Sequence, residues 1–117
     1  MDNKKFSREL EDRTKKFAVE IIRLSAMLPK TPERMVIRKQ ITESGTSVGA
    51  NCREANRARS RSDFRSKIRI CEGEATETQY WLEVIVGVKW LSHEEIKAIY
   101  DECSELLAVF TSIGKSM

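Results

Sequence analysis

The sequence has few of the residues that interrupt helices. Its 117 residues include only five glycines and two prolines, whereas 40% are hydrophobic and 33% are charged. A turn-rich β-sandwich and a disordered chain both fit this composition less well than a helix-rich soluble protein does. The length suits a single core, so we expect residues 1–117 to form one domain.

Paired cysteines and long hydrophobic runs are also missing. The three cysteines, Cys52, Cys71 and Cys103, are an odd number without Cys-x-x-Cys spacing, which indicates neither a disulfide framework nor a zinc site. The first ten residues contain no apolar stretch for a signal peptide, and no window approaches the ~20 apolar residues that span a bilayer. We therefore expect a soluble, cytoplasmic protein with reduced thiols and no membrane partner.

Histidine is nearly absent, which restricts the possible chemistry. The only histidine, His93, follows a predicted helix start, whereas di-metal bundles need Glu-x-x-His pairs and a catalytic Ser or Cys needs a neighbouring base. Glu74 and Glu77 share a helical face, but they have no nitrogen ligand beside them. We expect no metal, no cofactor, no catalytic residues and no enzymatic activity.

Apolar and small residues recur at alternating spacings of four and three, which places each set on one face of a helix. Four such stripes predict helices over about residues 8–28, 32–58, 62–91 and 92–113. Each later helix has a candidate N-terminal cap: Thr31 before Pro32, Ser60 or Ser62 before Asp63, and Ser92 in a capping box with Glu95. Short loops between amphipathic helices predict an all-α, up-and-down antiparallel four-helix bundle.

The second stripe has small and polar residues in its middle. Gly45 and Gly49 would each cost ~1 kcal/mol relative to Ala inside a helix, so we expect them to allow a close helix approach or a bend. Polar side chains near the same stripe predict a buried cluster that fixes the helix register, a structural role and not a catalytic one. These residues are Ser44, Ser47, Asn51 and Glu54.

Positive charge is concentrated in the first part of the chain. Residues 1–69 contain 18 Lys and Arg against 9 Asp and Glu, whereas residues 70–117 contain 3 against 9. Seven cations with only two acids, Glu54 and Asp63, give residues 53–69 a net charge of +5. We call these cations the basic tract: Arg53, Arg57, Arg59, Arg61, Arg65, Lys67 and Arg69.

Arginines four residues apart repel each other wherever the tract is helical, so we expect another group to neutralise them. One candidate is internal: the carboxylates of Glu72, Glu74, Glu77 and Glu83, in the same chain or in another subunit. The other is phosphate, which the guanidinium fork matches well. We predict that the tract binds RNA or DNA phosphates, with Arg13, Lys15 and Lys16 as secondary contacts. The alternative is a scaffold or adaptor whose ring assembly binds a protein partner.

Two segments carry a resemblance to a known family, SGTSVGANCREANRARSRSDF at residues 44–64 and EATETQYWL at residues 74–82. They resemble the four-helix-bundle proteins encoded within intervening sequences of bacterial 23S ribosomal RNA genes, and the similarity spans roughly residues 6–110. The resemblance implies a left-handed up-and-down bundle that assembles as a homopentamer with a basic surface. A related branch, the accessory variability determinants of diversity-generating retroelements, implies nucleic acid and a reverse transcriptase as partners. The branch encoded within 23S ribosomal RNA genes implies a ribosomal component instead.

Aromatic residues are concentrated near the end of the third predicted helix. Tyr80, Trp81 and Trp90 exceed what a lone bundle of this size needs in its core. A subunit contact over part of that helix would explain them.

Overall fold

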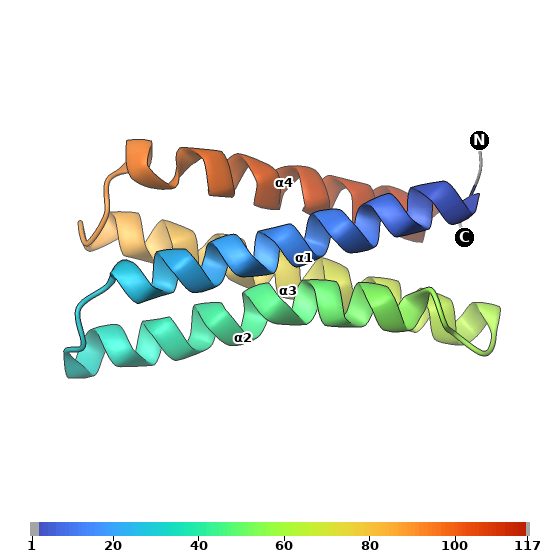
Figure 1. Cartoon of the computed structure of the whole chain (residues 1–117), viewed down its shortest axis with the longest axis horizontal. Coiled ribbons are helices and arrows are strands. Elements are labelled where there is room, and N and C mark those ends of the chain that lie inside the picture. Colours follow the sequence, from blue (N-terminus) through green and yellow to red (C-terminus); the bar gives the residue numbers. More distant parts are fainter. Residues whose placement is uncertain (1–2, 117) are drawn as a thin grey trace.

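The computed structural model describes residues 3–116 and contains four helices over that range (Figure 1). They are α1 (Asn3–Met27), α2 (Pro32–Ala55), α3 (Arg61–Gly87) and α4 (His93–Lys115). Residues 3–116 contain no strand, so the described chain is an all-α four-helix bundle. Figure 1 shows the helices side by side along the 44 Å long axis, with the connecting loops at the two ends. Helix α2 packs against α1 and α3, α3 also packs against α4, and the contact between α1 and α4 is much smaller.

The predicted caps are confirmed. The Thr31 hydroxyl oxygen accepts a hydrogen bond from the Arg34 backbone N–H, and Pro32 occupies the first turn of α2. Of the two serines that could begin α3, Ser60 is the cap, because its hydroxyl accepts a 3.0 Å bond from the Asp63 N–H. Ser92 and Glu95 form both bonds of the capping box at the start of α4.

The helix ends differ from the predicted ones by up to five residues. Helix α1 begins at Asn3 rather than at 8, since nothing between Asn3 and Ser7 breaks a helix, and α4 continues past Gly114 to Lys115 rather than ending at 113. Helix α2 ends at Ala55 rather than at 58, because the N–H of Arg57 bonds to the carbonyl three residues back and tightens the chain into a turn.

Helix α3 ends at Gly87 instead of 91 because the chain turns at Lys89. The φ angle of Lys89 is 64°, in the left-handed region. Its N–H bonds to the Val86 carbonyl, and the Trp90 N–H bonds to the Ile85 carbonyl, which is the hydrogen-bond pattern of a Schellman turn. The sequence did not predict this helix end, because a glycine normally occupies the left-handed position and here it is Lys89.

Two glycines allow α2 to approach α1 closely. A Cβ atom on Gly45 would lie 2.7 Å from Cγ2 of Ile21, which is too short for any real contact, and one on Gly49 would lie 3.3 Å from the backbone of Thr14. Ile21 and Thr14 are fully buried on the inner face of α1. Of the two roles expected for these glycines, close helix approach is therefore confirmed.

The core contains all three cysteines as free thiols. The thiol of Cys71 donates a 3.5 Å bond to the Val48 carbonyl, and that of Cys103 donates a 3.3 Å bond to the Ala75 carbonyl. Burial raises the pKa of Cys52 to about 11 and the pKa values of Cys71 and Cys103 to about 12. Each thiol is therefore neutral and poorly nucleophilic near neutral pH.

No helix in residues 3–116 combines the length and the apolar composition needed to cross a bilayer.

We predict opposite effects of alanine at two helical glycines. Gly45→Ala forces a methyl group into Ile21 and should lower the free energy of unfolding by about 1–3 kcal/mol, the usual range for overpacking. Gly73→Ala is the matched control: a Cβ there meets nothing within 4 Å, and the helix should gain about 0.5–1 kcal/mol. Urea unfolding followed by circular dichroism measures both, and a neutral Gly45→Ala variant would show that α1 and α2 are packed less tightly.

The thiols should react only when the chain opens. Because burial raises their pKa values in the folded state, the thiolate fraction is very small at pH 8 and rises only as the pH approaches 11 to 12. A thiol reagent such as Ellman's should therefore modify none of the three cysteines promptly at pH 8, and all three in denaturant. Prompt reaction of one thiol in the folded protein would show that it is not enclosed in the core.

Candidate nucleic-acid interface

The basic tract lies at one end of the bundle. It covers the last turn of α2, the loop at residues 56–60 and the first turns of α3. Figure 1 shows this loop at the end of the molecule where α1 begins and α4 ends. Because the chain reverses direction within the tract, its cations surround the α2–α3 corner and do not form one long helical row.

Five arginines of the tract are exposed, and none forms an ion pair with a carboxylate of residues 3–116. The only side-chain bond of this set is weak, from Nη1 of Arg57 to the Arg53 carbonyl at 3.5 Å. Their mutual repulsion is therefore not relieved within a single described chain. The five are Arg57, Arg59, Arg61, Arg65 and Arg69.

The other two cations of the tract are paired. Nε of Arg53 lies 3.2 Å from a carboxylate oxygen of Glu11, and Nζ of Lys67 lies 2.9 Å from one of Glu54. The hydrogen bond to Glu54 raises the pKa of Lys67, so this lysine stays charged at neutral pH. Pairs this exposed stabilise the fold only weakly and leave both cations accessible to a stronger anion.

Glu11 is a residue of this site that sequence reasoning missed. Besides Arg53, its carboxylate accepts a 2.7 Å bond from Nδ2 of Asn56 in the loop. Glu11 is on α1, 42 residues before Arg53. No spacing rule connects two helices at such a separation, so only their packing reveals the contact.

Besides a hollow between α1 and α2 whose lining includes Lys15, Arg53 and Glu54, two surface hollows lie beside the tract. An open hollow of about 710 Å³ is bordered by the end of α2, the loop and the start of α3, and its lining is Arg53, Glu54, Arg57, Arg59, Asp63 and Lys67. A smaller hollow of about 290 Å³ lies between α3 and α4, and its lining includes Arg65, Arg69, Glu72, Thr111 and Lys115. Lys115 thus belongs to the basic surface although it is 46 residues beyond Arg69, which is why the sequence pattern missed it.

The carboxylates considered as internal partners of the tract make other contacts. Glu72 accepts a 2.6 Å bond from the Thr111 hydroxyl, and Glu83 accepts one of 2.8 Å from the Tyr100 hydroxyl. Glu77 accepts a 3.1 Å bond from Nε1 of Trp81. No ion pair joins these residues or Glu74 to the tract within residues 3–116.

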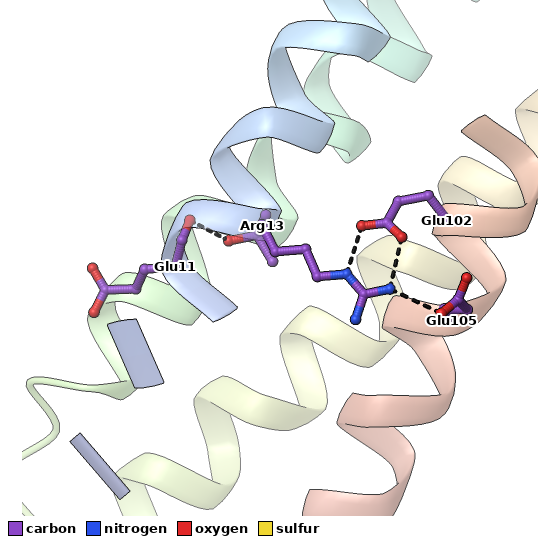
Figure 2. Close-up of polar contacts among 5 residues, drawn as sticks. Glu11, Arg13, Glu102 and Glu105 are labelled. Atoms are coloured by element: carbon purple, nitrogen blue, oxygen red, sulfur yellow. Dashed lines mark hydrogen bonds and ion pairs between the residues drawn. The ribbon is translucent and has the colours of Figure 1, made fainter. Parts of the chain in front are cut away.

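The secondary contacts expected on the first helix divide into two groups. Figure 2 shows the Arg13 guanidinium directed at α4, where it makes two 2.7 Å bonds to Glu102 and a 3.1 Å bond to Glu105. This fork joins the two helices with the smallest interhelical contact, so Arg13 has a structural partner. Lys15 and Lys16 are exposed on α1.

The four polar residues expected to form one cluster are in three different environments. Ser44 is buried and accepts a 2.8 Å bond from the Thr78 hydroxyl across the α2–α3 contact. Ser47 and Asn51 donate to carbonyls of their own helix, and exposed Glu54 accepts from Lys67. The buried cross-helix contact is therefore the Ser44–Thr78 pair, and Thr78 was missed as a polar partner because its position fits the apolar stripe.

The aromatic residues also occupy two environments. Trp90 is half-buried, and the Arg34 guanidinium lies 4.7 Å from its ring centroid. Tyr80 is 57% exposed and packs edge-on against half-buried Trp81, with ring centroids 5.0 Å apart. We use the name apolar ledge for Tyr80, Trp81, exposed Ile70 of α3 and exposed Val88, which follows the last residue of α3.

Within residues 3–116, no group of three or more His, Cys, Asp and Glu side chains is arranged to hold a metal ion.

Comparisons with known proteins agree with this architecture. A crystal structure at 1.70 Å resolution of a protein of unknown function, from the S23 ribosomal protein family of Bacteroides thetaiotaomicron VPI-5482, superposes with a TM-score of 0.86. The two chains are 38% identical, over 93% of this chain and 97% of the other. The comparison with curated proteins finds no match. Residues 8–112 match the family described as 23S rRNA-intervening sequence protein, and the chain therefore belongs to this family.

Proposed function

We propose that the protein is a non-enzymatic, oligomeric nucleic-acid-binding protein that contacts RNA or DNA phosphates through its basic tract. The observation that carries this proposal is the set of five exposed arginines without a carboxylate partner at one end of the bundle. With Arg53, Lys67 and Lys115 beside them, they form a concentrated positive surface. A polyanion neutralises several of these charges at once.

Arginine suits this role better than lysine would. Its planar fork donates two parallel hydrogen bonds to phosphate oxygens and remains charged at any physiological pH. Six of the seven cations in the tract are arginines. Binding through phosphates is tolerant of sequence and sensitive to salt, because it releases condensed counterions. The described fold has no RNA-reading sheet, so we assign the surface to backbone recognition and not to base readout.

The family description favours RNA as the first ligand to test. It refers to intervening sequences of 23S rRNA, and the similar crystal structure is assigned to an S23 ribosomal protein family. We propose a cytoplasmic protein bound to RNA or DNA beside a ribosomal component, which both descriptions favour. A reverse transcriptase as partner rests on the retroelement branch of the resemblance alone. The reduced, buried thiols support the cytoplasmic assignment.

The oligomeric part of the proposal is supported by the apolar ledge on α3. Ile70, Tyr80 and Val88 are each more than two-fifths exposed in the single chain, and Trp81 lies beside them. Exposed aromatic and branched side chains along one helix are typical of a surface that another protein covers. We propose that copies of this chain meet there, as subunits of a pentameric ring of left-handed, up-and-down bundles. The order of helix contacts around the bundle and its short loops support the up-and-down arrangement.

The same ledge favours a second candidate function. A scaffold or adaptor would use the ledge, with Glu77 at its edge, to hold a different protein, and its arginines would pair with carboxylates of other subunits. This candidate predicts no affinity for nucleic acid even at low salt. The two candidates therefore differ in one binding measurement.

We predict that replacing three unpaired arginines weakens nucleic-acid binding. The variant Arg57→Gln/Arg59→Gln/Arg61→Gln should bind a labelled ribosomal RNA fragment about tenfold or more weakly at low salt, if each lost contact is worth about 0.5 kcal/mol or more. The slope of log K against log salt should become shallower by about 2 to 3, since each phosphate contact contributes 0.7 to 0.9. Fluorescence anisotropy over a salt series measures both quantities.

The matched control removes the same charge elsewhere. Arg23, Lys30 and Lys39 are exposed cations outside the tract, and none forms an ion pair within residues 3–116. Their replacement by Gln should leave most of the affinity and slope unchanged. Equal losses of affinity in the two triple variants would indicate a general effect of charge and not a site. If the unaltered protein does not bind nucleic acid at low salt, the scaffold is favoured.

We predict that the ledge is needed for assembly. Tyr80→Ser with Val88→Ser should reduce the mass measured by light scattering and native mass spectrometry to that of one chain, because apolar area at a contact would be lost. Both side chains are exposed in the single chain, so the helical content should not change. Met27→Ser with Met35→Ser, two comparably exposed residues, is the control. If the unaltered protein is a monomer, the proposed ring is wrong. If the mass of the Tyr80 and Val88 variant is unchanged, the subunits do not meet through the ledge.

A further inference from the structure

The cations of the basic surface lie on opposite sides of α3. Lys67 reaches Glu54 of α2, and it lines the larger hollow with Arg57 and Arg59 of the loop. Arg65 and Arg69 instead line the smaller hollow with Lys115 of α4. Successive helical residues are rotated by ~100°, so positions 65 and 67 differ by about 200° around the axis. The surface is thus two separate lines of positive charge, with the start of α3 between them.

Small side chains lie on the outward face of α3, together with exposed Arg69 and, on the side toward Lys67, exposed Ile70. Ser62, Ser66 and Gly73 share one outward face of α3, since they are separated by four and seven residues, and all three are exposed. A Cβ atom on Gly73 would meet nothing within 4 Å, which shows that this ridge is open. Another backbone can therefore approach the α3 ridge closely while cations project on both sides of it.

The spacing of the two lines is that of two strands across a groove. A helix with its side chains is ~10–12 Å wide, so cations on opposite sides of α3 are separated by at least about that distance. The major groove of B-form DNA is about 12 Å wide, and the minor groove of A-form RNA is wide and shallow, with phosphates along both edges. A single strand has one line of phosphates and can satisfy only one side of α3 at a time.

Aromatic side chains needed to stack unpaired bases are missing from both hollows. Proteins that bind single strands place exposed aromatics beside their cations. The only aromatic residue in the linings of these hollows is Phe110, which is fully buried. Of the exposed aromatics, Phe6 is in the first turn of α1 and lines neither hollow, and Tyr80 is 11 residues beyond Arg69, or about 16 Å along the axis.

We propose that the bound nucleic acid is double-stranded, with the start of α3 lying along a groove and each line of cations contacting the phosphates of a different strand. This inference rests on the proposed function and narrows it to a duplex. It also assigns to Lys115, on the last helix, a phosphate contact in the same line as Arg65 and Arg69.

The test compares one sequence as a 20-base-pair duplex and as its separate strands, in RNA and in DNA, with equal ionic strength. We expect the duplex to bind at least tenfold more tightly than either strand. Arg57→Gln/Arg59→Gln on one side and Arg65→Gln/Arg69→Gln on the other should each weaken duplex binding severalfold and flatten its salt slope by about 2. Lys115→Gln should flatten it by about 1.

The control for charge is Arg23→Gln/Lys39→Gln, which alters neither line and should leave the duplex preference intact. Equal or tighter binding of single strands would overturn the duplex inference but leave phosphate binding in place. A loss confined to the Arg57 and Arg59 variant would show that only one line is used, which also overturns it. If neither the duplex nor the separate strands bind at low salt, the proposed function itself fails. This result differs from the other two outcomes, in which some nucleic acid still binds.

Discussion

The close contact between α1 and α2 determines where the basic surface forms. Gly45 and Gly49 bring α2 against Ile21 and Thr14, and Ser44 opposite these glycines is bonded to Thr78 of α3. Helix α2 is therefore held on two sides, and its end is positioned relative to both neighbours. Helix α2 ends at buried Ala55, and the chain turns there because the Arg57 N–H bonds to the Glu54 carbonyl. The arginines that follow are placed around this corner of the bundle, where none of them forms an ion pair with a carboxylate of residues 3–116.

Acidic and basic side chains of this protein are separated in the folded structure as well as along the sequence. Carboxylates of α3 and α4 accept hydrogen bonds from Thr111, Tyr100 and Trp81, and those at Glu102 and Glu105 hold Arg13. These contacts use acidic groups that could otherwise neutralise the tract. The fold thus keeps five arginines accessible, at a cost in repulsion of a few tenths of a kcal/mol for each close pair. A tightly packed core can tolerate such a cost, which an external anion would remove.

The interior contributes stability and no evident chemistry. Its three thiols are neutral, bonded to carbonyls or enclosed by apolar groups, and its buried hydroxyl pair joins two helices. The accessible groups are instead the basic surface at one end and the ledge of Tyr80 and Trp81 along α3. Tyr80 is 11 residues beyond Arg69 on α3, so an assembly through Tyr80 and Trp81 would leave the arginines of the loop and of the start of α3 exposed in every copy. Repetition of a weak phosphate site around a ring would increase its affinity without any new contact.

Local sequence determined much of this protein. The period of the apolar residues indicated four helices, and the caps at Thr31, at Ser60 or Ser62, and at Ser92 indicated three of their starts. The density of arginine indicated the basic tract. Each of these signals is carried by residues within a few turns of one another. Tertiary packing decided which charges meet: Glu11 with Arg53, Arg13 with Glu102, and Lys115 with Arg69 come from different helices. It also decided that the tract bends around α3 into two lines. Periodicity along one chain assigns a residue to a helix face, but the partner of that face depends on how separate helices pack in three dimensions.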